Sequence, residues 1–351
     1  MIIPEDLREI NQVAELVSEH AINALYATPP VWDVLLGAPN FNPDQVLRAM
    51  SSGSQLPATT AEKIKNMIHP EGRLINMYGP TEVCMVCSYA EVTEFDTKPV
   101  VGRPARGYEV FIVDEEMNML PAGIPGEIVA HSKNLALGYL NKKELTDEKF
   151  VPNPFGEGRI YKTGDIGCWD LSGNIVYVGR NDDQVKINGY RIECGEIEHQ
   201  LRTREGVQEA VVLAKETDQG KDLVAYVVAT DSTVSPEGLR DGLKEHVPDY
   251  MVPVAFVLLE KMPLNPNGKT DRKKLLEIQH EKTTRSEYQA PETETESTLV
   301  KLWEELLMVS QVGTKDNFFD LGGNSIKATR LINTYLKDFN VKLNLKDLFL
   351  N

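Results

Sequence analysis

Short apolar runs that alternate with glycine- and proline-containing turns fill the first half of the chain. Residues 5–22 have helical periodicity, and the apolar runs Ala21–Ala27 and Arg73–Met77 predict strands. From Val100 onward, glycine and proline interrupt the pattern often, which is typical of a β-rich unit. The strands expected there are Gly107–Asp114, Gly126–His131, Arg159–Lys162 and Asn174–Val178. Residues 1–181 are therefore expected to combine α/β layers with a β-rich subdomain.

The pattern changes near residue 182, and a small α/β unit is predicted over residues 182–281. A proline in the first turn of a helix is favourable because its missing N–H would be unpaired there in any case, and Ser235-Pro236 has this form. The other elements expected in this unit are a helix over Glu196–Arg204 and strands at Ala210–Ala214, Leu223–Ala229 and Val254–Leu259.

The C-terminal part predicts a polar linker, residues 282–291, followed by a helical unit, residues 292–351. Thr293 and Glu296 have the spacing of a capping box at a helix start. Apolar residues then recur at helical spacing: Leu299, Leu302, Trp303 and Leu306. So short a unit is small for an independent core, and we expect it to be truncated by a final helix. The fold class expected for the chain is multidomain, mixed α+β and α/β, with an all-α helical bundle last.

The net charge of −16 argues against a non-specific binder of nucleic acid or of an anionic membrane surface. It leaves ATP chemistry open, because a locally basic site with a metal ion can bind ATP in an acidic protein. The apolar content of 41% is ordinary for a globular protein, and no run reaches the roughly 18 apolar residues of a membrane span. Residues Met1 to Glu9 lack the apolar core of a signal peptide.

Four cysteines are too few and too scattered for a disulfide framework. Cys84 and Cys87 form a Cys-x-x-Cys pair, but no second pair completes a zinc site, and Cys168 and Cys194 stand alone. We expect Cys84 and Cys87 to be small apolar residues of a core segment. A reducing cytoplasm is the compartment that fits this cysteine usage best.

Ser325 lies in the string Asp-Asn-Phe-Phe-Asp-Leu-Gly-Gly-Asn-Ser-Ile-Lys-Ala, residues 316–328. The glycines allow a tight turn and the close approach of a partner. The serine opens an apolar-periodic run (Ile326, Thr329, Ile332, Leu336), so we expect it exposed at a helix N-terminus, where backbone N–H groups favour a phosphate. Phe318 and Phe319 would anchor the loop. Alone, the turn would also fit an ordinary helix N-cap.

Four further strings combine residue types that suit nucleotide chemistry. Asn76–Glu82 places an aromatic ring, a hydroxyl and a carboxylate after an apolar strand, where α/β sheets bind ligands. Tyr161–Asp165 again follows a predicted strand, and its aspartate suits the hydroxyls of a ribose. Gly179–Glu198 alternates charged with apolar residues at the domain boundary, as a hinge with a ligand-facing strand requires. Pro263–Arg272 presents one lysine that can stabilise phosphate and carboxylate charge. Each string alone also fits a surface turn or a solvated charge run.

In this order and spacing, the four strings resemble the later core motifs of nonribosomal peptide synthetase adenylation domains, members of the adenylate-forming superfamily. The string around Ser325 resembles the phosphopantetheine attachment site of peptidyl carrier domains; the one departure is Asn324, where that family more often has Asp or His. The resemblance implies that residues 1–181 are the C-terminal part of an adenylation core. Residues 182–281 would be its small C-terminal subdomain, and residues 292–351 a truncated carrier domain after the linker.

The resemblance also implies residue roles. Tyr78 would stack on adenine, Thr81 would contact the α-phosphate and Glu82 would bind Mg²⁺. Lys269 would bridge the substrate carboxylate and the phosphate, and Ser325 would carry 4′-phosphopantetheine. The further positions are Asp165 at the ribose hydroxyls, Tyr177 and Arg180 beside the nucleotide, Asp182 at the hinge, and Gly189 and Tyr190 in the loop used for thioester formation. The positions that match the family's side-chain pocket are Ala27, Met50, Ser52, Met77, Met85 and Val86, which favour an apolar or medium-sized acid.

By the same resemblance, the Ser/Thr/Gly-rich phosphate loop and the segment whose aspartate binds the substrate ammonium would precede residue 1. The function expected is activation of an amino or related acid with ATP and Mg²⁺ as acyl-AMP, then loading as a thioester onto the pantetheine of Ser325. Expected partners are the missing N-terminal half of the core, a phosphopantetheinyl transferase and neighbouring condensation or other synthetase modules, but no nucleic acid and no membrane. One alternative is a carrier or docking fragment without independent adenylation activity. An acyl- or aryl-CoA ligase, which would not need Ser325, is another.

Overall fold

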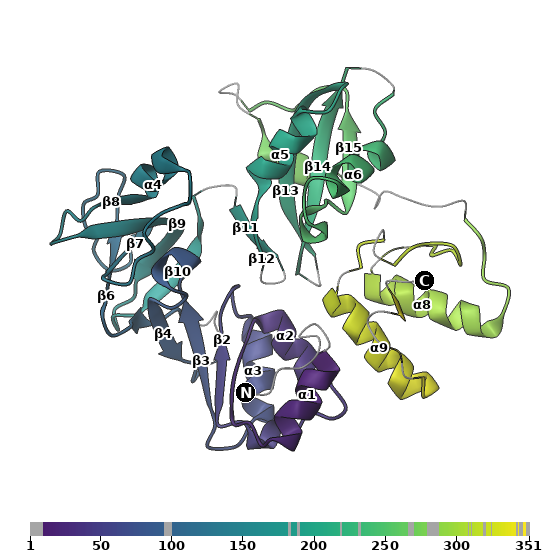
Figure 1. The fold of residues 1–351 in the computed structure, drawn as a ribbon, viewed down its shortest axis with the longest axis horizontal. Helices are drawn as coiled ribbons and strands as arrows, with labels where there is room; N and C mark the ends of the chain where they lie inside the picture. The colour runs from purple at the N-terminus through teal and green to yellow at the C-terminus, as the bar shows by residue number, and fades with distance from the viewer. Residues whose placement is uncertain are drawn as a thin grey trace. The chain divides into compact units, whose positions relative to one another are not determined.

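The structure, a computed structural model, consists of two compact units, Met1–Asp182 and Asp183–Asn351 (Figure 1). The residues that it describes are 10–94, 100–181, 184–187, 190–217, 220–230, 233–265, 270–278, 288–307, 309, 311–318, 321–323, 325–341, 343 and 347–348. Within these residues, no helix is long and apolar enough to cross a membrane. Mixed helices and sheets confirm the multidomain fold class expected from the sequence.

The first unit begins with an α/β layer whose strands pair in the order β1-β2-β3-β4-β5. Strands β1, β2 and β3 are parallel, so their carboxyl ends meet at one edge of the sheet, whereas β4 and β5 pair antiparallel. The bounds are α1 Ile10–Glu19, β1 Ala24–Ala27, α2 Pro29–Leu35, β2 Arg48–Ser51, α3 Ala58–Met67, β3 Arg73–Tyr78, β4 Ser88–Glu91 and β5 Arg103–Pro104, with 3₁₀ turns η1 Pro43–Gln45 and η2 Thr81–Val83. The sequence pattern predicted α1, β1 and β3 but not α2, β2, α3 or β4.

The β-rich subdomain of this unit has the strand order β10-β9-β7-β6, and β8 also pairs with β9. The bounds are β6 Tyr108–Val113, β7 Gly126–Ser132, α4 Lys143–Lys149, β8 Phe150–Pro152, β9 Arg159–Trp169 and β10 Ile175–Arg180. The expectation that the string Tyr161–Asp165 follows a strand is wrong. Strand β9 runs through the string: Asp165 pairs with Arg180 of β10, and the pairing with β7 shifts register here, from Lys162 to Ile166.

A seam of backbone hydrogen bonds joins the two sheets of the first unit. The Val101 N–H donates to the Ile175 carbonyl at 3.0 Å, and the Ile175 N–H donates to the Gly102 carbonyl at 2.7 Å. Gly102 has φ +80°, and a Cβ there would lie 1.9 Å from the Tyr89 carbonyl oxygen, so only glycine fits. Tyr78 from β3 shares one buried cluster with Ile112 and Ile175 from the second sheet, among other residues.

In the second unit, residues 184–278 form a small α/β subdomain. Its sheet has the order β13-β14-β15, and β11 and β12 form a separate hairpin. The bounds are β11 Gln184–Ile187, β12 Tyr190–Glu193, α5 Cys194–Arg202, β13 Val207–Thr217, β14 Gly220–Ala229, α6 Pro236–Lys244, η3 Asp249–Met251, β15 Ala255–Leu259 and α7 Arg272–Glu277. All five elements predicted from the sequence are present, and the Ser235 hydroxyl caps α6 by accepting from the Gly238 N–H at 3.1 Å.

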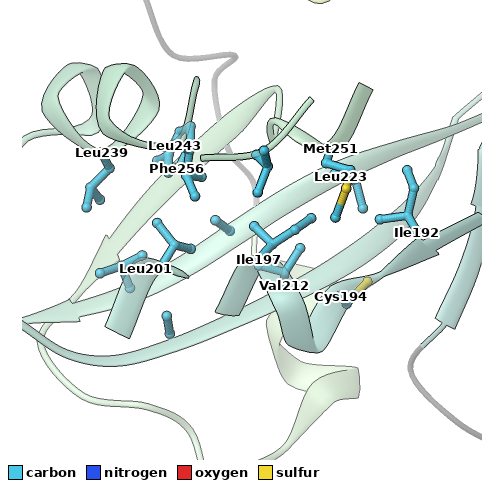
Figure 2. Packing of buried hydrophobic residues seen from close by; sticks show 14 of the residues in the cluster. Ile192, Cys194, Ile197, Leu201, Val212, Leu223, Leu239, Leu243, Met251 and Phe256 are labelled. Carbon is cyan, nitrogen blue, oxygen red and sulfur yellow. The ribbon is translucent and has the colours of Figure 1, made fainter. Parts of the chain in front are cut away.

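The core of this subdomain follows the alternation of side chains along its strands. Val212 and Leu223 pack with Ile197 and Leu201 of α5 and with Leu243 of α6 on one face of the sheet (Figure 2). On the other face, side chains from β13, β14 and β15 pack with Met262 and with Leu275 of α7. Helices therefore cover both faces of the sheet, which explains why β14 reads as a continuous apolar run.

The C-terminal helical part contains α8 (Glu294–Leu307) and α9 (Ser325–Phe339). The capping box is confirmed: the Glu296 N–H donates to the Thr293 hydroxyl at 3.1 Å, and the Thr293 N–H donates to the Glu296 carboxylate at 2.9 Å. The predicted apolar positions of α8 pack on a cluster that includes Leu331 and Tyr335 of α9. Residues 282–287 of the predicted linker lie outside the described residues.

The prediction for the Cys-x-x-Cys pair holds for one member. Cys87 is buried in the core of the first unit, but Cys84 is exposed, so the prediction is wrong there. Cys84 has φ +57°, and this left-handed conformation at the end of η2 changes the direction of the chain. Its thiol donates to the Asn134 carbonyl at 2.9 Å.

Candidate functional site

The turn after β3 brings together the residue types that the sequence placed in one string. The strand ends at Tyr78, Gly79 and Pro80 follow, and η2 presents Thr81 exposed and Glu82 buried. A Cβ on Gly79 would lie 2.6 Å from the Met85 carbonyl oxygen, so the tightness of this turn requires glycine. The predicted turn at the carboxyl end of β3 is thus confirmed.

Asp165 of β9 is the centre of a buried polar cluster in the first unit. The Tyr78 hydroxyl donates to Asp165 Oδ2 at 2.6 Å, and Arg180 Nη1 donates to Asp165 Oδ1 at 2.6 Å. The Asp165 residue is 1% exposed and Tyr78 is 6% exposed, so both groups are almost fully removed from water. Burial raises the pKa of Tyr78 well above its usual value, and the adjacent Asp165 carboxylate raises that pKa further. Tyr78 therefore remains a neutral hydrogen-bond donor.

The backbone around Asp165 is held by its own β-rich subdomain. The Thr163 hydroxyl donates to the Ile128 carbonyl at 2.6 Å and accepts from the Asp165 N–H at 3.0 Å. The Gly164 N–H donates to the Glu127 carboxylate at 2.9 Å. The Ile128 carbonyl, the Thr163 hydroxyl and the Glu127 carboxylate thus hold residues 163–165 in place. The Asp165 carboxylate is therefore oriented before any ligand binds.

Glu82 is 7% exposed and accepts a hydrogen bond from the Tyr139 hydroxyl at 2.6 Å. The Tyr139 and Tyr161 hydroxyl oxygens lie 3.2 Å apart, so the two phenols and the carboxylate form a chain of polar contacts. Burial, followed by the hydrogen bond to Glu82, raises the pKa of Tyr139, so it also stays a neutral donor. Sequence reasoning missed Tyr139, because no local pattern links it to a residue 57 positions earlier.

The chemistry of these donors fits a nucleotide with a divalent cation. A carboxylate has about four acceptor positions, and the donors Tyr78 and Arg180 use two of those on Asp165, which leaves acceptor capacity of the kind that ribose hydroxyls require. The Tyr177 ring lies beside that of Tyr78, with centroids 6.4 Å apart. No group of three His, Cys, Asp or Glu side chains within the described residues forms a metal site. The Glu82 carboxylate is a ligand of the type that binds Mg²⁺ together with phosphate oxygens.

The six positions expected to line the acid pocket lie at or beyond the carboxyl ends of β1, β2 and β3. The strand registers pair Tyr26 with Met50 and Ala27 with Ser51, so the ends of β1 and β2 are level. Ser52 is 4% exposed, and its hydroxyl accepts from the Tyr26 hydroxyl at 3.2 Å. The remaining positions are Met77 on β3 and Met85 and Val86 in the following turn, with Met85 exposed. The structure thus places these residues at or beyond one edge of the sheet, where the expected polar position, Ser52, is hydrogen-bonded to Tyr26.

In the small subdomain, Tyr190 is the first residue of β12 and stacks on Tyr250, with ring centroids 4.2 Å apart and an angle of 8° between the rings. Asp182, Gly189 and Lys269 lie outside the described residues. The base of the Lys269 loop is described: Leu264 and Thr270 form an isolated β-bridge, and the Asp271 N–H donates to the Pro263 carbonyl at 2.8 Å.

The turn before α9 has the tight geometry expected for an attachment site. Gly322 has φ +88°, and a Cβ on Gly323 would lie 2.3 Å from the Phe318 ring. Phe318 is 2% exposed and meets Trp303 edge to face at 5.2 Å, so the anchoring expected of Phe318 is confirmed. Ser325 begins α9 as predicted, whereas its side chain and Phe319 lie outside the described residues.

Three families match this chain in order. Residues 1–140 match AMP-binding enzyme, residues 196–269 match AMP-binding enzyme C-terminal domain, and residues 297–351 match Phosphopantetheine attachment site. Tyrocidine synthase 3 of Brevibacillus parabrevis is 40% identical over 354 residues, which cover 99% of this chain and 5% of that protein. Bacitracin synthase 2 of Bacillus licheniformis is 39% identical over 363 residues, 100% of this chain and 14% of that protein. The chain belongs to the nonribosomal peptide synthetase family.

Solved structures agree with this membership. An NRPS protein containing adenylation and PCP domains, in its holo form bound to a vinylsulfonamide inhibitor, is 27% identical and superposes with a TM-score of 0.75. The match covers 94% of this chain and 55% of that protein. This nonribosomal peptide synthetase chain therefore contains adenylation-domain and carrier-domain parts, and it spans only a small share of the curated relatives named above.

Proposed function

We propose that this chain is part of a synthetase module that activates an amino or related acid with ATP and loads it onto its own carrier domain. In the first step, a carboxylate oxygen of the acid attacks the α-phosphorus of ATP, pyrophosphate leaves, and acyl-AMP forms. The observation that carries the proposal is the buried cluster in which Tyr78 and Arg180 converge on Asp165 from different strands. Buried, oriented and partly desolvated polar groups of this kind are typical of a ligand site.

The roles proposed for the first unit come from the family resemblance, and this geometry supports them. Tyr78 and Tyr177 contact the adenine, Asp165 accepts from the ribose hydroxyls, and Arg180, beside the nucleotide, orients the Asp165 carboxylate. Thr81, exposed on η2, contacts the α-phosphate. Glu82 on the same turn is the protein ligand of Mg²⁺, which neutralises phosphate charge during the reaction. The acid binds at the edge formed by β1, β2 and β3.

The roles proposed for the second unit concern the change between the two half-reactions. Lys269 bridges the substrate carboxylate and phosphate during adenylation, and Asp182 lies at the hinge. Gly189 and Tyr190 act during thioester formation, and Tyr190 is the first residue of β12. The stacking of Tyr190 on Tyr250 supports a fixed position for this end of the hairpin.

Ser325 is the proposed attachment site of 4′-phosphopantetheine. A phosphopantetheinyl transferase would form a bond between the serine oxygen and phosphorus and break the pyrophosphate bond of coenzyme A, releasing adenosine 3′,5′-bisphosphate. When attached, the group supplies the thiol that accepts the acyl chain from AMP. Neighbouring synthetase modules are the proposed partners. A cytoplasmic location is proposed on the four cysteines, which are all free thiols.

The intact mass of the purified chain tests the proposal. The chain is incubated with a phosphopantetheinyl transferase, coenzyme A, Mg·ATP and a pool of amino acids, beside the variants Ser325→Ala and Ser297→Ala. We expect a phosphopantetheine increment in the wild type and in Ser297→Ala, and none in Ser325→Ala. A further acyl increment identifies the substrate. No increment in the wild type contradicts the carrier role, and a phosphopantetheine increment alone limits the activity of these 351 residues to carriage.

A further inference from the structure

The segment between β7 and α4 contacts the turn that carries Glu82 at three points. The Tyr139 hydroxyl donates to Glu82 Oε1 at 2.6 Å, and the Ala136 N–H donates to the Glu82 carbonyl at 2.8 Å. The Cys84 thiol donates to the Asn134 carbonyl at 2.9 Å. The segment, residues 134–139, is called the clamp segment below. It therefore fixes both the backbone and the side chain of Glu82.

The clamp segment is itself held from its other side. Gly138 has φ +147°, and the Tyr139 N–H donates to the Thr146 hydroxyl of α4 at 2.9 Å. Two guanidinium nitrogens of Arg159 donate to the carbonyls of Leu137 and Ala136, each at 3.2 Å. Because α4 and β9 hold the segment on this side, it is a stable platform for the Tyr139 hydroxyl.

We propose that Tyr139 is a positioning residue that fixes the Glu82 carboxylate for Mg²⁺. The proposal rests on the proposed function, in which Glu82 is the metal ligand. The Tyr139 hydroxyl, which donates to Glu82 Oε1 at 2.6 Å in a buried site, restricts the rotation of the carboxylate group. Mg²⁺ requires near-octahedral geometry, so the orientation of each oxygen ligand matters for its binding. Groups that hydrogen-bond to metal ligands change metal affinity about 10- to 100-fold when they are removed.

Packing of the Tyr139 ring alone does not explain the arrangement. The ring meets Phe150 edge to face, with centroids 5.7 Å apart, and a phenylalanine would keep this contact. The hydroxyl instead lies between Glu82 and the Tyr161 hydroxyl. The variant Tyr139→Phe therefore removes the polar contact and leaves the packing in place.

The test uses Tyr139→Phe in the 351-residue chain, with Tyr226→Phe as the matched control. Tyr226 is also buried, and its hydroxyl has no hydrogen-bond partner within the described residues, so the control removes a buried hydroxyl that holds nothing. The first measurement is the affinity for Mn²⁺ in the presence of ATP, from the electron paramagnetic resonance signal of free Mn²⁺. The second is the rate at which iodoacetamide alkylates Cys84, located by peptide mass spectrometry.

We expect Tyr139→Phe to weaken Mn²⁺ binding about 10-fold, with ATP binding in the absence of metal unchanged. Alkylation of Cys84 should become several-fold faster. The variant loses the hydrogen bond from Tyr139 to Glu82, which loosens the clamp segment and with it the Asn134 carbonyl that accepts from the Cys84 thiol. Tyr226→Phe should match the wild type in both measurements. Equal Mn²⁺ affinity in folded Tyr139→Phe and wild type would overturn the proposal.

The two measurements also separate this proposal from the proposed function. A wild-type chain that binds no Mn·ATP contradicts the nucleotide site itself. In that case the rate of Cys84 alkylation still tests whether Tyr139 has a positioning role. An unchanged rate in Tyr139→Phe overturns its positioning role, and a faster rate supports it.

Discussion

The Tyr78 hydroxyl and the Asp165 carboxylate, 87 residues apart in the chain, lie 2.6 Å from each other in the core of the first unit. The contact joins the last residue of β3 in one sheet to the middle of β9 in another. The proposed adenine and ribose contacts are thereby placed side by side before a nucleotide binds. Preorganisation of this kind reduces the free energy that ligand binding must spend on ordering side chains.

Replacing Asp165 should be more damaging than replacing its tyrosine partner. Asp165→Ala leaves the Arg180 guanidinium, whose side chain is 9% exposed, without its carboxylate. We expect a loss of about 3–5 kcal/mol in the free energy of unfolding, because the buried guanidinium loses the carboxylate that offsets its charge. Tyr78→Phe removes one hydrogen bond to a charged group and should cost about 1.5–3 kcal/mol. Urea denaturation of both variants checks this order, and equal losses would contradict it.

Stability should fall at alkaline pH because of the buried phenols. The pKa values of Tyr78 and Tyr139 are raised in the folded protein, mainly by burial. Their contribution to stability is therefore complete below the unfolded pKa of about 10 and is lost as pH rises through the folded pKa. We expect the free energy of unfolding to decline above about pH 10 and to decline less in Tyr78→Phe. Denaturation at a series of pH values measures both slopes, and identical slopes would exclude Tyr78 as a cause.

Gly323→Ala should disturb the attachment turn. The new Cβ would lie 2.3 Å from the Phe318 ring, which is fixed against Trp303. We expect a loss of about 1–3 kcal/mol in stability and slower phosphopantetheinylation of Ser325. Gly195→Ala is the matched control, because nothing lies within 4 Å of a Cβ there, and it should stabilise α5 by about 0.5–1 kcal/mol. Thermal unfolding and timed intact-mass measurements test both variants; a Gly323→Ala chain modified at the wild-type rate would show that the turn tolerates a methyl group.

Tyr226→Phe should leave the small subdomain as stable as the wild type or more stable by about 1 kcal/mol. The Tyr226 hydroxyl is buried and has no hydrogen-bond partner within the described residues, so its desolvation is not offset there. Removing it keeps the ring in the core between β14 and α7. Calorimetric unfolding measures the change, and a clear loss of stability would indicate a hydrogen-bond partner such as an ordered water.

Local signals made part of this fold predictable. The capping box at Thr293 and Glu296, the proline after Ser235 and the helix that begins at Ser325 each depend on residues within a few positions of one another, and each is present. The elements α2, β2 and α3 were missed because short segments of this kind derive their stability from packing in the α/β layer rather than from their own periodicity.

The sequence motifs of the site could be predicted, but the spatial contacts between their residues could not. Tyr78 and Glu82 were identified from one string, yet their partners Asp165 and Tyr139 come from other strands and loops. Tyr139 gave no signal, because a tyrosine in a glycine-containing loop is common and its partner is set by tertiary packing. The pairing of Asp165 with Arg180 of β10 likewise shows that Asp165 lies within a strand. The roles of Lys269, Asp182 and Gly189 stay predictions, since these residues lie outside the described part of the chain.

The seam at Val101, Gly102 and Ile175 has a consequence for exchanging parts between synthetases. A chimaera that takes only the α/β layer from a relative, to acquire its acid pocket, places foreign residues on one side of this seam. The contacts that cross the seam join Val101 and Gly102 to Ile175 through their backbones, so a shifted backbone at Val101 or Gly102 in the foreign layer would break them and separate the two sheets. The pocket edge would then lose its alignment with Asp165 even if every pocket residue were correct. A chimaera should therefore take residues 73–180 from one parent. The carboxyl end of β3, the seam and the proposed ribose contact at Asp165 then come from the same protein.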